Sequence, residues 1–179
     1  MWPLTARAGS ATLISVNTDL EEAHMTTTTL DAPDTARLTA ASTIQAMLPR
    51  LVALTLDAKQ AHWNVTGPGF VQLHALTDEL AADVRTWTDR LAERAVALGS
   101  PVDARPATVA AGTGRSFPNG WVTDREAAVE LVGRIDPVAE LIHASLAELE
   151  LFDAVAHDAA IETLEGLEKY RWMLLAHTR

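Results

Sequence analysis

Residues 62–93 read HWNVTGPGFVQLHALTDELAADVRTWTDRLAE, and the rest of the chain is best understood from this stretch. The Gly-Pro-Gly triplet at 67–69 interrupts any regular structure, and an apolar pattern of helical period follows it over 70–98. The stretch also concentrates histidine and carboxylate side chains, the residue types that bind metals in the absence of cysteine. It therefore predicts a helical hairpin that carries candidate metal ligands.

Five residues of this stretch are candidate ligands: His62, His74, Asp78, Asp89 and Glu93. His74 and Asp78 are four residues apart, as are Asp89 and Glu93, so each pair occupies neighbouring turns of one helix face. At about 100° per residue, these four positions fall within one arc of about 100° around a continuous helix. The helix is thus predicted to present both pairs on one side.

The two pairs are too far apart along that helix to bind the same ion. The eleven residues from Asp78 to Asp89 correspond to about 16 Å at about 1.5 Å per residue. Bonds from a protein to a transition metal are only about 2 Å long. A second copy of the helix, antiparallel across a two-fold axis, would bring one chain's first pair against its neighbour's second pair. The spacing therefore favours a metal site shared between subunits.

Composition limits the chemistry. The chain has 179 residues, of which 48% are hydrophobic, and this suits a single domain with one core. It has no cysteine, so any metal must be held by histidine and carboxylate, which favours iron, manganese or zinc. The formal net charge of −10 favours cations over polyphosphate as ligands.

The N-terminal residues have a different composition from the rest. Residues 1–34 are mostly small and polar, with several acidic residues against Arg7 alone, and we interpret them as a disordered or extended tail before a domain at 35–179. Residues Met1 to Gly9 contain no apolar run long enough for the core of a signal peptide, and no later segment resembles a membrane span. We expect a cytoplasmic protein.

Helical periodicity accounts for most of the domain. A stripe of apolar residues predicts a first helix from Thr35 to about Val65, although Pro49 should kink it or leave one hydrogen bond unmade. The second helix follows at 70–98. Residues 101–122 are rich in proline and glycine and are interpreted as a long connection, with one helical turn expected near Val109.

Two more helices are predicted after this connection. Thr123 and Glu126 form a capping box that opens a third helix, which reaches about Ala156 and should bend at Pro137. Asp158 can cap a fourth helix that ends near residue 175. Four long helices, two tight connections and one long crossover between the second and third describe an all-α, ferritin-like four-helix bundle.

A metal site within one subunit is not expected. Bundle proteins with two metals usually take a Glu-x-x-His motif from each of two helices. Glu140 and His143 form one such motif, but the other, Glu21 and His24, lies in the N-terminal tail. We therefore interpret Glu140 and His143 as surface or packing residues.

Several short motifs resemble the signature of one family, the Dps miniferritins. They are His-Trp-Asn-Val at 62–65, Gly67-Pro68, Leu73-His74, Asp78-Glu79, Asp89, Leu-Ala-Glu-Arg at 91–94, Leu98-Gly99, Glu168-Lys169 and Trp-Met-Leu at 172–174. The resemblance extends from Thr35 to His177, and the His-Trp-Asn-Val segment with its downstream spacing is its most specific part.

The resemblance implies a hollow dodecamer, located in the bacterial cytoplasm or nucleoid, with ferroxidase centres at its two-fold interfaces. His62, His74 and Asp78 would come from one subunit, and Asp89 and Glu93 from its partner. Each centre would bind up to two iron ions and oxidise Fe(II) with hydrogen peroxide or dioxygen. The Fe(III) would then be stored as a mineral inside the shell, which limits oxidative damage.

The resemblance also points to residues around these centres. Trp63 would lie near the iron without binding it, although an aromatic residue that fills the subunit interface is an equal alternative. The acidic residues near the junction of the last two helices would line iron-entry pores on three-fold axes, or simply form a solvated face. These pore candidates are Asp153, Asp158, Glu162 and Glu165.

Three functions remain open at this stage. The first is the iron-oxidising and iron-storing shell. The second is a nucleoid-binding Dps that protects DNA by coating it; many Dps proteins do so through lysine-rich tails, whereas this tail is acidic, so we expect weak or absent DNA binding. The third is a shell whose interface site holds zinc or another divalent ion for a hydrolytic or structural role.

Overall fold

The computed structural model describes residues 34–114 and 116–179, and the predictions made for residues 1–33 lie outside it. The elements along this part of the chain are α1 (Asp34–Asn64), β1 (Val65–Thr66), α2 (Phe70–Ala97), α3 (Pro106–Gly112), β2 (Val122–Thr123), α4 (Asp124–Phe152) and α5 (Ala154–His177).

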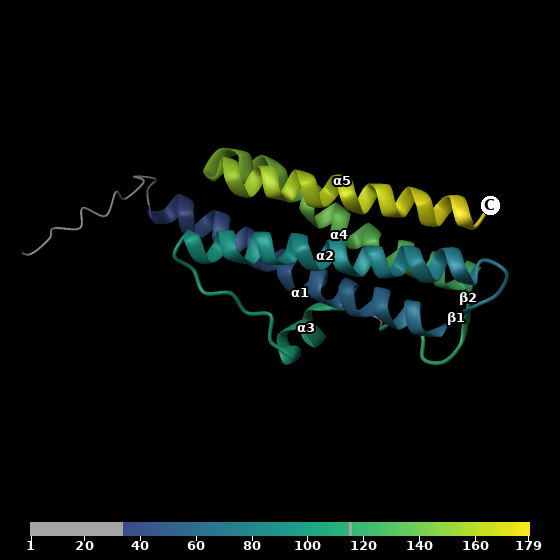
Figure 1. Ribbon diagram of the computed structural model, residues 1–179. Coiled ribbons are helices and arrows are strands. Elements are labelled where there is room, and N and C mark those ends of the chain that lie inside the picture. Colours follow the sequence, from purple (N-terminus) through teal and green to yellow (C-terminus); the bar gives the residue numbers. More distant parts are fainter. Residues whose placement is uncertain (1–33, 115) are drawn as a thin grey trace, which may run out of the picture. The chain divides into compact units, whose positions relative to one another are not determined.

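The four long helices form a bundle (Figure 1). Helix α1 packs mainly against α2 and α4, and α5 packs against α4 and α2. A tight turn joins α1 to α2, whereas the connection from α2 to α4 is long and carries α3, which lies against α1. The all-α bundle, the crossover between the second and third long helices and the helical turn at Val109 are thus confirmed.

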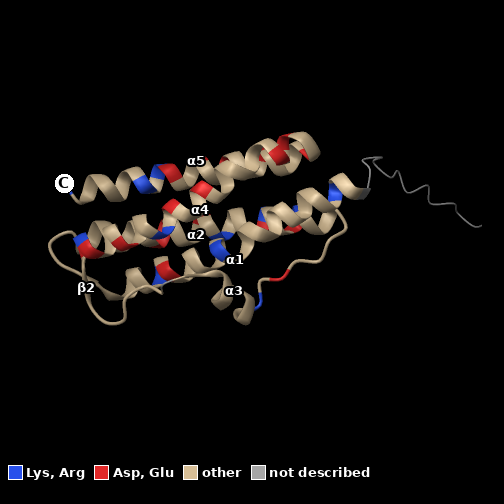
Figure 2. Ribbon diagram, turned by 180° about the vertical axis from the view of Figure 1, so that it is seen from behind, with Lys and Arg blue, Asp and Glu red and all other residues tan. Residues whose placement is uncertain are grey.

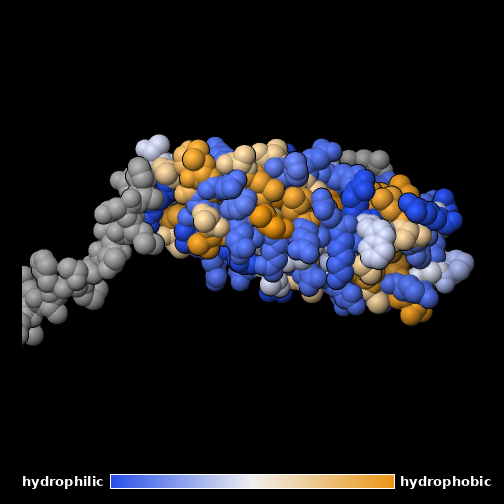
Figure 3. All heavy atoms as spheres, turned by 90° about the horizontal axis from the view of Figure 1, so that it is seen from above, coloured by the Kyte–Doolittle hydropathy of each residue, from blue (hydrophilic) through white to orange (hydrophobic). Residues whose placement is uncertain are grey.

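Charged and apolar side chains are interspersed on the surface. Figure 2 shows acidic and basic residues along all four long helices, and on α5 the acidic residues lie toward its start, before Lys169 and Arg171. Figure 3, which looks down on α5, shows several apolar patches between polar side chains. Leu151 at the end of α4 and Val155 and Ile161 of α5 are among the exposed apolar residues. The bundle therefore keeps apolar surface available for contacts with other molecules.

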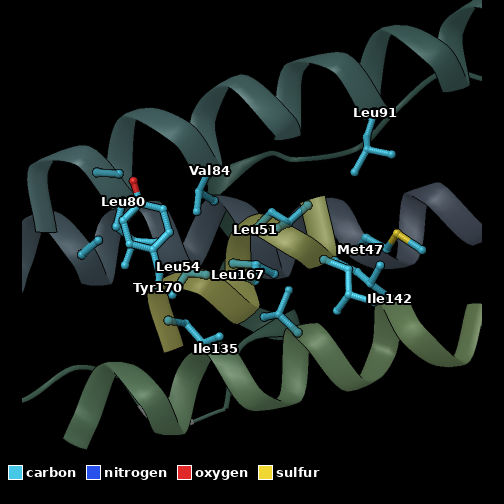
Figure 4. Packing of buried hydrophobic residues seen from close by; sticks show 14 of the residues in the cluster. Met47, Leu51, Leu54, Leu80, Val84, Leu91, Ile135, Ile142, Leu167 and Tyr170 are labelled. Carbon is cyan, nitrogen blue, oxygen red and sulfur yellow. The ribbon is translucent and has the colours of Figure 1, made fainter. Parts of the chain in front are cut away.

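The core is built from leucine, isoleucine and alanine contributed by all four long helices. Leu51, Leu80, Ile135 and Leu167 come from different helices, and Figure 4 shows such residues grouped between the ribbons. Each is almost fully buried. Burial of each such side chain contributes about 1.5–3 kcal/mol, so the apolar stripes seen in the sequence drive the assembly of the bundle.

Most helix boundaries follow the capping and breaking residues. Thr123 and Glu126 form the expected capping box, in which Thr123 N donates to Glu126 Oε2 at 2.9 Å and Glu126 N donates to Thr123 Oγ1 at 3.2 Å. Neither proline that was expected to bend a helix interrupts one: α1 continues through Pro49, and α4 continues through Pro137.

The junction between α4 and α5 differs from the prediction. Helix α4 ends at Phe152 rather than near Ala156, and Asp153, not Asp158, caps α5 by accepting the Ala156 N–H at 2.6 Å. Asp153 is also paired across helices: Arg94 of α2 donates to Asp153 Oδ1 at 2.9 Å, so the capping carboxylate has a fixed place at the junction. Sequence patterns alone do not reveal this pairing between distant helices.

A short parallel bridge was not predicted either. Val65 pairs with Val122, and Thr66 pairs with Thr123, so β1 joins the end of α1 to the residues just before α4. The Thr66 hydroxyl also donates to the carbonyl of Val122 at 3.1 Å. Two residues per strand are too few to give a periodic pattern, so the sequence carries no signal for them.

Arg134 fixes the long crossover to the bundle. Its Nη2 donates to the carbonyl of Ser116 at 2.7 Å, and its Nε lies 2.9 Å from Asp57 Oδ2 on α1. The guanidinium also stacks over Phe117, with 5.0 Å between its Cζ and the ring centroid. Burial raises the pKa of Asp57, an effect that the Arg134 charge opposes. One side chain of α4 therefore links α1 to the connection that precedes α4.

Helices α2 and α5 meet through an aromatic contact. The rings of Trp87 and Tyr170 pack edge to face with 6.4 Å between centroids, and the Tyr170 hydroxyl donates to Asp83 Oδ2 at 2.6 Å. Burial and the nearby Asp83 carboxylate raise the pKa of Tyr170. A Cβ added to Gly166 would lie 2.2 Å from the Trp87 indole, so α5 needs a glycine at this point.

Two helical glycines should therefore respond oppositely to alanine. We expect Gly166→Ala to destabilise the fold by about 1–3 kcal/mol, because the Trp87 indole must move within a packed contact. In α4, Gly133 has no atom within 4 Å of an added Cβ, so Gly133→Ala should stabilise the fold by about 0.5–1 kcal/mol. Denaturant unfolding of both variants measures the difference, and equal effects would contradict the packing described for Trp87.

Candidate metal centre

The two predicted histidine ligands lie together at the turn between α1 and α2. His62 is in the last turn of α1, and His74 follows the turn within α2. Their rings stack with 3.7 Å between centroids at an interplanar angle of 20°. The His62 Nδ1 lies 2.8 Å from the carbonyl oxygen of His74, and the His74 Nδ1 lies 2.8 Å from the carbonyl oxygen of His62. The histidines therefore fix each other's orientation.

These reciprocal hydrogen bonds also decide which ring nitrogen can bind a metal. A carbonyl oxygen only accepts hydrogen bonds, so Nδ1 must carry the hydrogen in both rings. In the neutral ring, Nε2 then holds a free lone pair, which is the form that coordinates metal ions. A backbone acceptor on the other nitrogen is the usual support of a metal-binding histidine. The geometry thus fits the chemistry predicted for His62 and His74.

The carboxylate of Asp78 lies one turn along α2 from His74 and is paired with Lys59 of α1. The Lys59 Nζ donates to Asp78 Oδ1 at 2.5 Å. This hydrogen bond holds the pKa of Asp78 below its usual range, and the charges of Lys59, His62 and His74 act in the same direction. Asp78 is therefore ionised at neutral pH and is available as an anionic oxygen ligand.

The start of α2 is held in place by Asp124 of α4. The Gly69 N–H donates to Asp124 Oδ2 at 2.5 Å, and His177 Nε2 lies 3.6 Å from the same oxygen. A Cβ on Gly69 would come within 2.4 Å of both Asp124 Oδ2 and His177 Cε1, so only glycine fits there. These contacts position the first turn of α2, five residues before His74. No sequence pattern distinguishes Asp124 as a site residue, although it directly follows the capping Thr123.

Asp89 and Glu93 lie farther along α2, as the helical periodicity predicts. Both side chains are exposed, and Asp89 lines a groove between α1 and α2 together with Val52 and Leu56. Helix α2 is continuous, so the distance of about 16 Å between Asp78 and Asp89 holds in the structure. Within residues 34–114 and 116–179, no group of three or more ligand-type side chains comes together in a single chain.

Known proteins resemble this chain in sequence and in fold. Residues 42–179 match the family model for the ferritin-like domain. DNA protection during starvation protein 2 of Deinococcus radiodurans is 31% identical over 170 residues, which cover 94% of this chain and 70% of that protein. The corresponding protein of Mycolicibacterium smegmatis is 32% identical over 140 residues, covering 76% of this chain and 75% of its own length. The chain belongs to the Dps family of ferritin-like proteins.

A solved Dps structure agrees with the fold. Dps from Microbacterium arborescens in its high iron form superposes with a TM-score of 0.78 and is 35% identical in sequence. The match covers 82% of this chain and 96% of that one. The ferritin-like resemblance drawn from the His-Trp-Asn-Val segment is thus confirmed over most of the domain.

The other residues singled out in this Dps chain have varied surroundings. Trp63 is 64% exposed, beside the histidine pair. Glu140 and His143 line a groove between α4 and α5.

Within the described residues, no helix is both long enough and apolar enough to cross a membrane.

Arginines of α2 neutralise most of the acidic residues predicted for the pores. Asp153 pairs with Arg94, while Asp158 and Glu162 both pair with Arg90. Glu165 is exposed on α5. Three of these four acids are therefore bound to cationic partners within the subunit, which the sequence pattern did not predict.

Proposed function

We propose that this protein is an iron-oxidising and iron-storing miniferritin whose ferroxidase centres are each shared by two subunits. The observation that carries the proposal is the reciprocal histidine pair beside Asp78, with Asp89 and Glu93 exposed on the same helix about 16 Å away. His62, His74 and Asp78 would bind iron together with Asp89 and Glu93 of a second copy.

The ligand types suit iron as the substrate. Neutral imidazole and carboxylate bind Fe(II), and anionic oxygen ligands stabilise Fe(III) more strongly, which favours oxidation. Two Fe(II) ions give one electron each to hydrogen peroxide, which with two protons yields two Fe(III) and two water molecules. No hydroxyl radical is released in this balance.

Several features support the pairing of two copies along α2. The second pair of ligands is exposed, and Asp89 lies in a groove bordered by Leu56, which is itself 60% exposed. An antiparallel two-fold arrangement would set the histidine end of each α2 against the carboxylate end of the other. It would therefore complete two identical centres per pair and cover apolar surface around Leu56 and Trp63.

We further propose that such pairs assemble into a closed homo-oligomeric shell, a dodecamer as in the family resemblance. The exposed apolar residues Leu151 and Val155, at the end of α4 and the start of α5, provide surface for a second kind of contact. Fe(III) formed at the centres would collect inside the shell. In this proposal, pores near Asp153, Asp158, Glu162 and Glu165 would admit iron, with Arg90 and Arg94 moderating their charge.

Removal of either partner carboxylate should slow oxidation without preventing assembly. We expect Asp89→Asn and Glu93→Gln each to lower the rate of ferric absorbance, after apo-protein is mixed with Fe(II) and peroxide, by about 10–100-fold. Glu150→Gln, which changes an exposed carboxylate of α4, serves as the control and should oxidise iron normally. The mass by light scattering should be unchanged in all three. If Asp89→Asn and Glu93→Gln oxidise iron at the wild-type rate, ferroxidase activity at this site is excluded and a zinc or structural site is favoured.

DNA coating is the second candidate, since the relatives are named for DNA protection. The charge distribution does not favour it, because acidic residues accompany the basic ones along the helices and the charged residues among the first 34 are mainly acidic. Binding to DNA requires cationic groups that neutralise phosphates and release counterions. We therefore expect no stable complex in a gel shift of the purified assembly with duplex DNA at about 0.15 M salt. Tight, salt-sensitive retardation would instead support the coating function.

A further inference from the structure

Lys59 is a cation placed inside the candidate metal centre. It lies three residues before His62 on α1, and its Nζ is 2.5 Å from Asp78 Oδ1. The side chain is 29% exposed, less than the 59% of Asp78. The chain has only one other lysine, Lys169, among 14 basic residues. The position of Lys59 therefore bears directly on how Asp78 can accept a metal ion.

The charges of the completed centre explain why a cation would rest there. Two copies would bring Asp78 close to the partner's Asp89 and Glu93 in the shared centre proposed above. Three neighbouring carboxylates repel one another unless a positive charge lies between or beside them. Before iron arrives, the Lys59 ammonium supplies that charge at Asp78.

Iron and the ammonium compete for the same carboxylate. An ion bound at Asp78 Oδ1 must replace the Lys59 hydrogen bond. An ion bound at Oδ2 would still lie within a few ångströms of the ammonium, and like charges at that distance repel. In both cases, stable iron binding requires Lys59 to move away from Asp78.

Trp63 offers a place for the displaced ammonium. The Lys59 Nζ already lies 5.6 Å from the centroid of the Trp63 indole, within the range of a cation–π interaction. Lysine has a flexible four-carbon stem and a compact charge, so a small rotation can move it from Asp78 toward the indole. An arginine would hold the carboxylate with two hydrogen bonds and would be harder to displace.

Building on the function proposed above, we propose that Lys59 is a displaceable counter-cation that occupies Asp78 in the metal-free centre and sets its affinity for Fe(II). Iron binds by expelling the ammonium toward Trp63, so the centre stays neutralised both before and after loading. Lys59 is a positioning residue, because it acts on iron through Asp78.

The test compares the two lysines of the chain. Lys59→Met and Lys169→Met each remove one positive charge, but only Lys59 contacts Asp78. Binding of Fe(II) to the full-length apo-protein, measured anaerobically by calorimetry, reports affinity without oxidation. We expect Lys59→Met to bind Fe(II) about two- to fivefold more tightly than Lys169→Met, the range typical of an exposed ion pair. Lys59→Arg should bind more weakly than wild type.

Further variants separate failure of this inference from failure of the proposed function. If Asp78→Asn loses Fe(II) binding while Lys59→Met and Lys169→Met bind alike, the role of Lys59 is refuted and the site stands. If Asp78→Asn binds Fe(II) as tightly as the wild type does, the proposed metal centre is itself refuted. Light scattering checks assembly of each variant, and Lys59→Gln replaces Lys59→Met if the latter does not assemble. The advantage of Lys59→Met should also shrink at high ionic strength, where the Lys59–Asp78 pair is screened.

Discussion

The rigidity of α2 is the constraint on which the candidate centre depends. A continuous helix keeps Asp78 and Asp89 about 16 Å apart, far beyond the reach of one metal ion. No rotation of side chains can close that distance. The exposure of Asp89 and Glu93, and the groove beside Asp89, leave this end of α2 open to a second molecule. In the proposed function, the length of this one helix therefore makes iron oxidation depend on oligomerisation.

Tertiary contacts prepare the other end of α2 for metal binding. Each histidine donates to the backbone of the other, so folding of the α1–α2 turn selects the tautomer that leaves Nε2 free. Asp124 fixes the Gly69 backbone, and Lys59 keeps Asp78 charged and paired. The imidazoles are therefore oriented within one chain, without help from a partner. Iron binding would then need only the approach of the second copy and the departure of one ammonium.

The sequence predicted the bundle because strong apolar stripes and clear breakers such as Gly-Pro-Gly at 67–69 carry that information. The resemblance to the Dps signature implied that His62 and His74 serve the same centre, and the structure stacks their rings 3.7 Å apart. The sequence could not predict which charges pair across helices. Arg94 pairs with Asp153 at the α4–α5 junction, and Lys59 pairs with Asp78. Both pairs join segments that are far apart in sequence. Such pairings depend on helix packing, which periodicity alone does not define.

A mixture of two inactive variants tests the shared centre most directly. His74→Ala removes one half of a centre and Asp89→Asn the other, so an assembly of either variant alone should oxidise iron slowly. If a centre takes its halves from two chains, one of the two centres in every mixed pair is intact, and random reassembly should restore about a quarter of the wild-type centres. Recovered ferric absorbance in the mixture, with mixed assembly verified by mass, is the predicted result. A mixture no more active than its components would contradict the sharing of the centre between subunits.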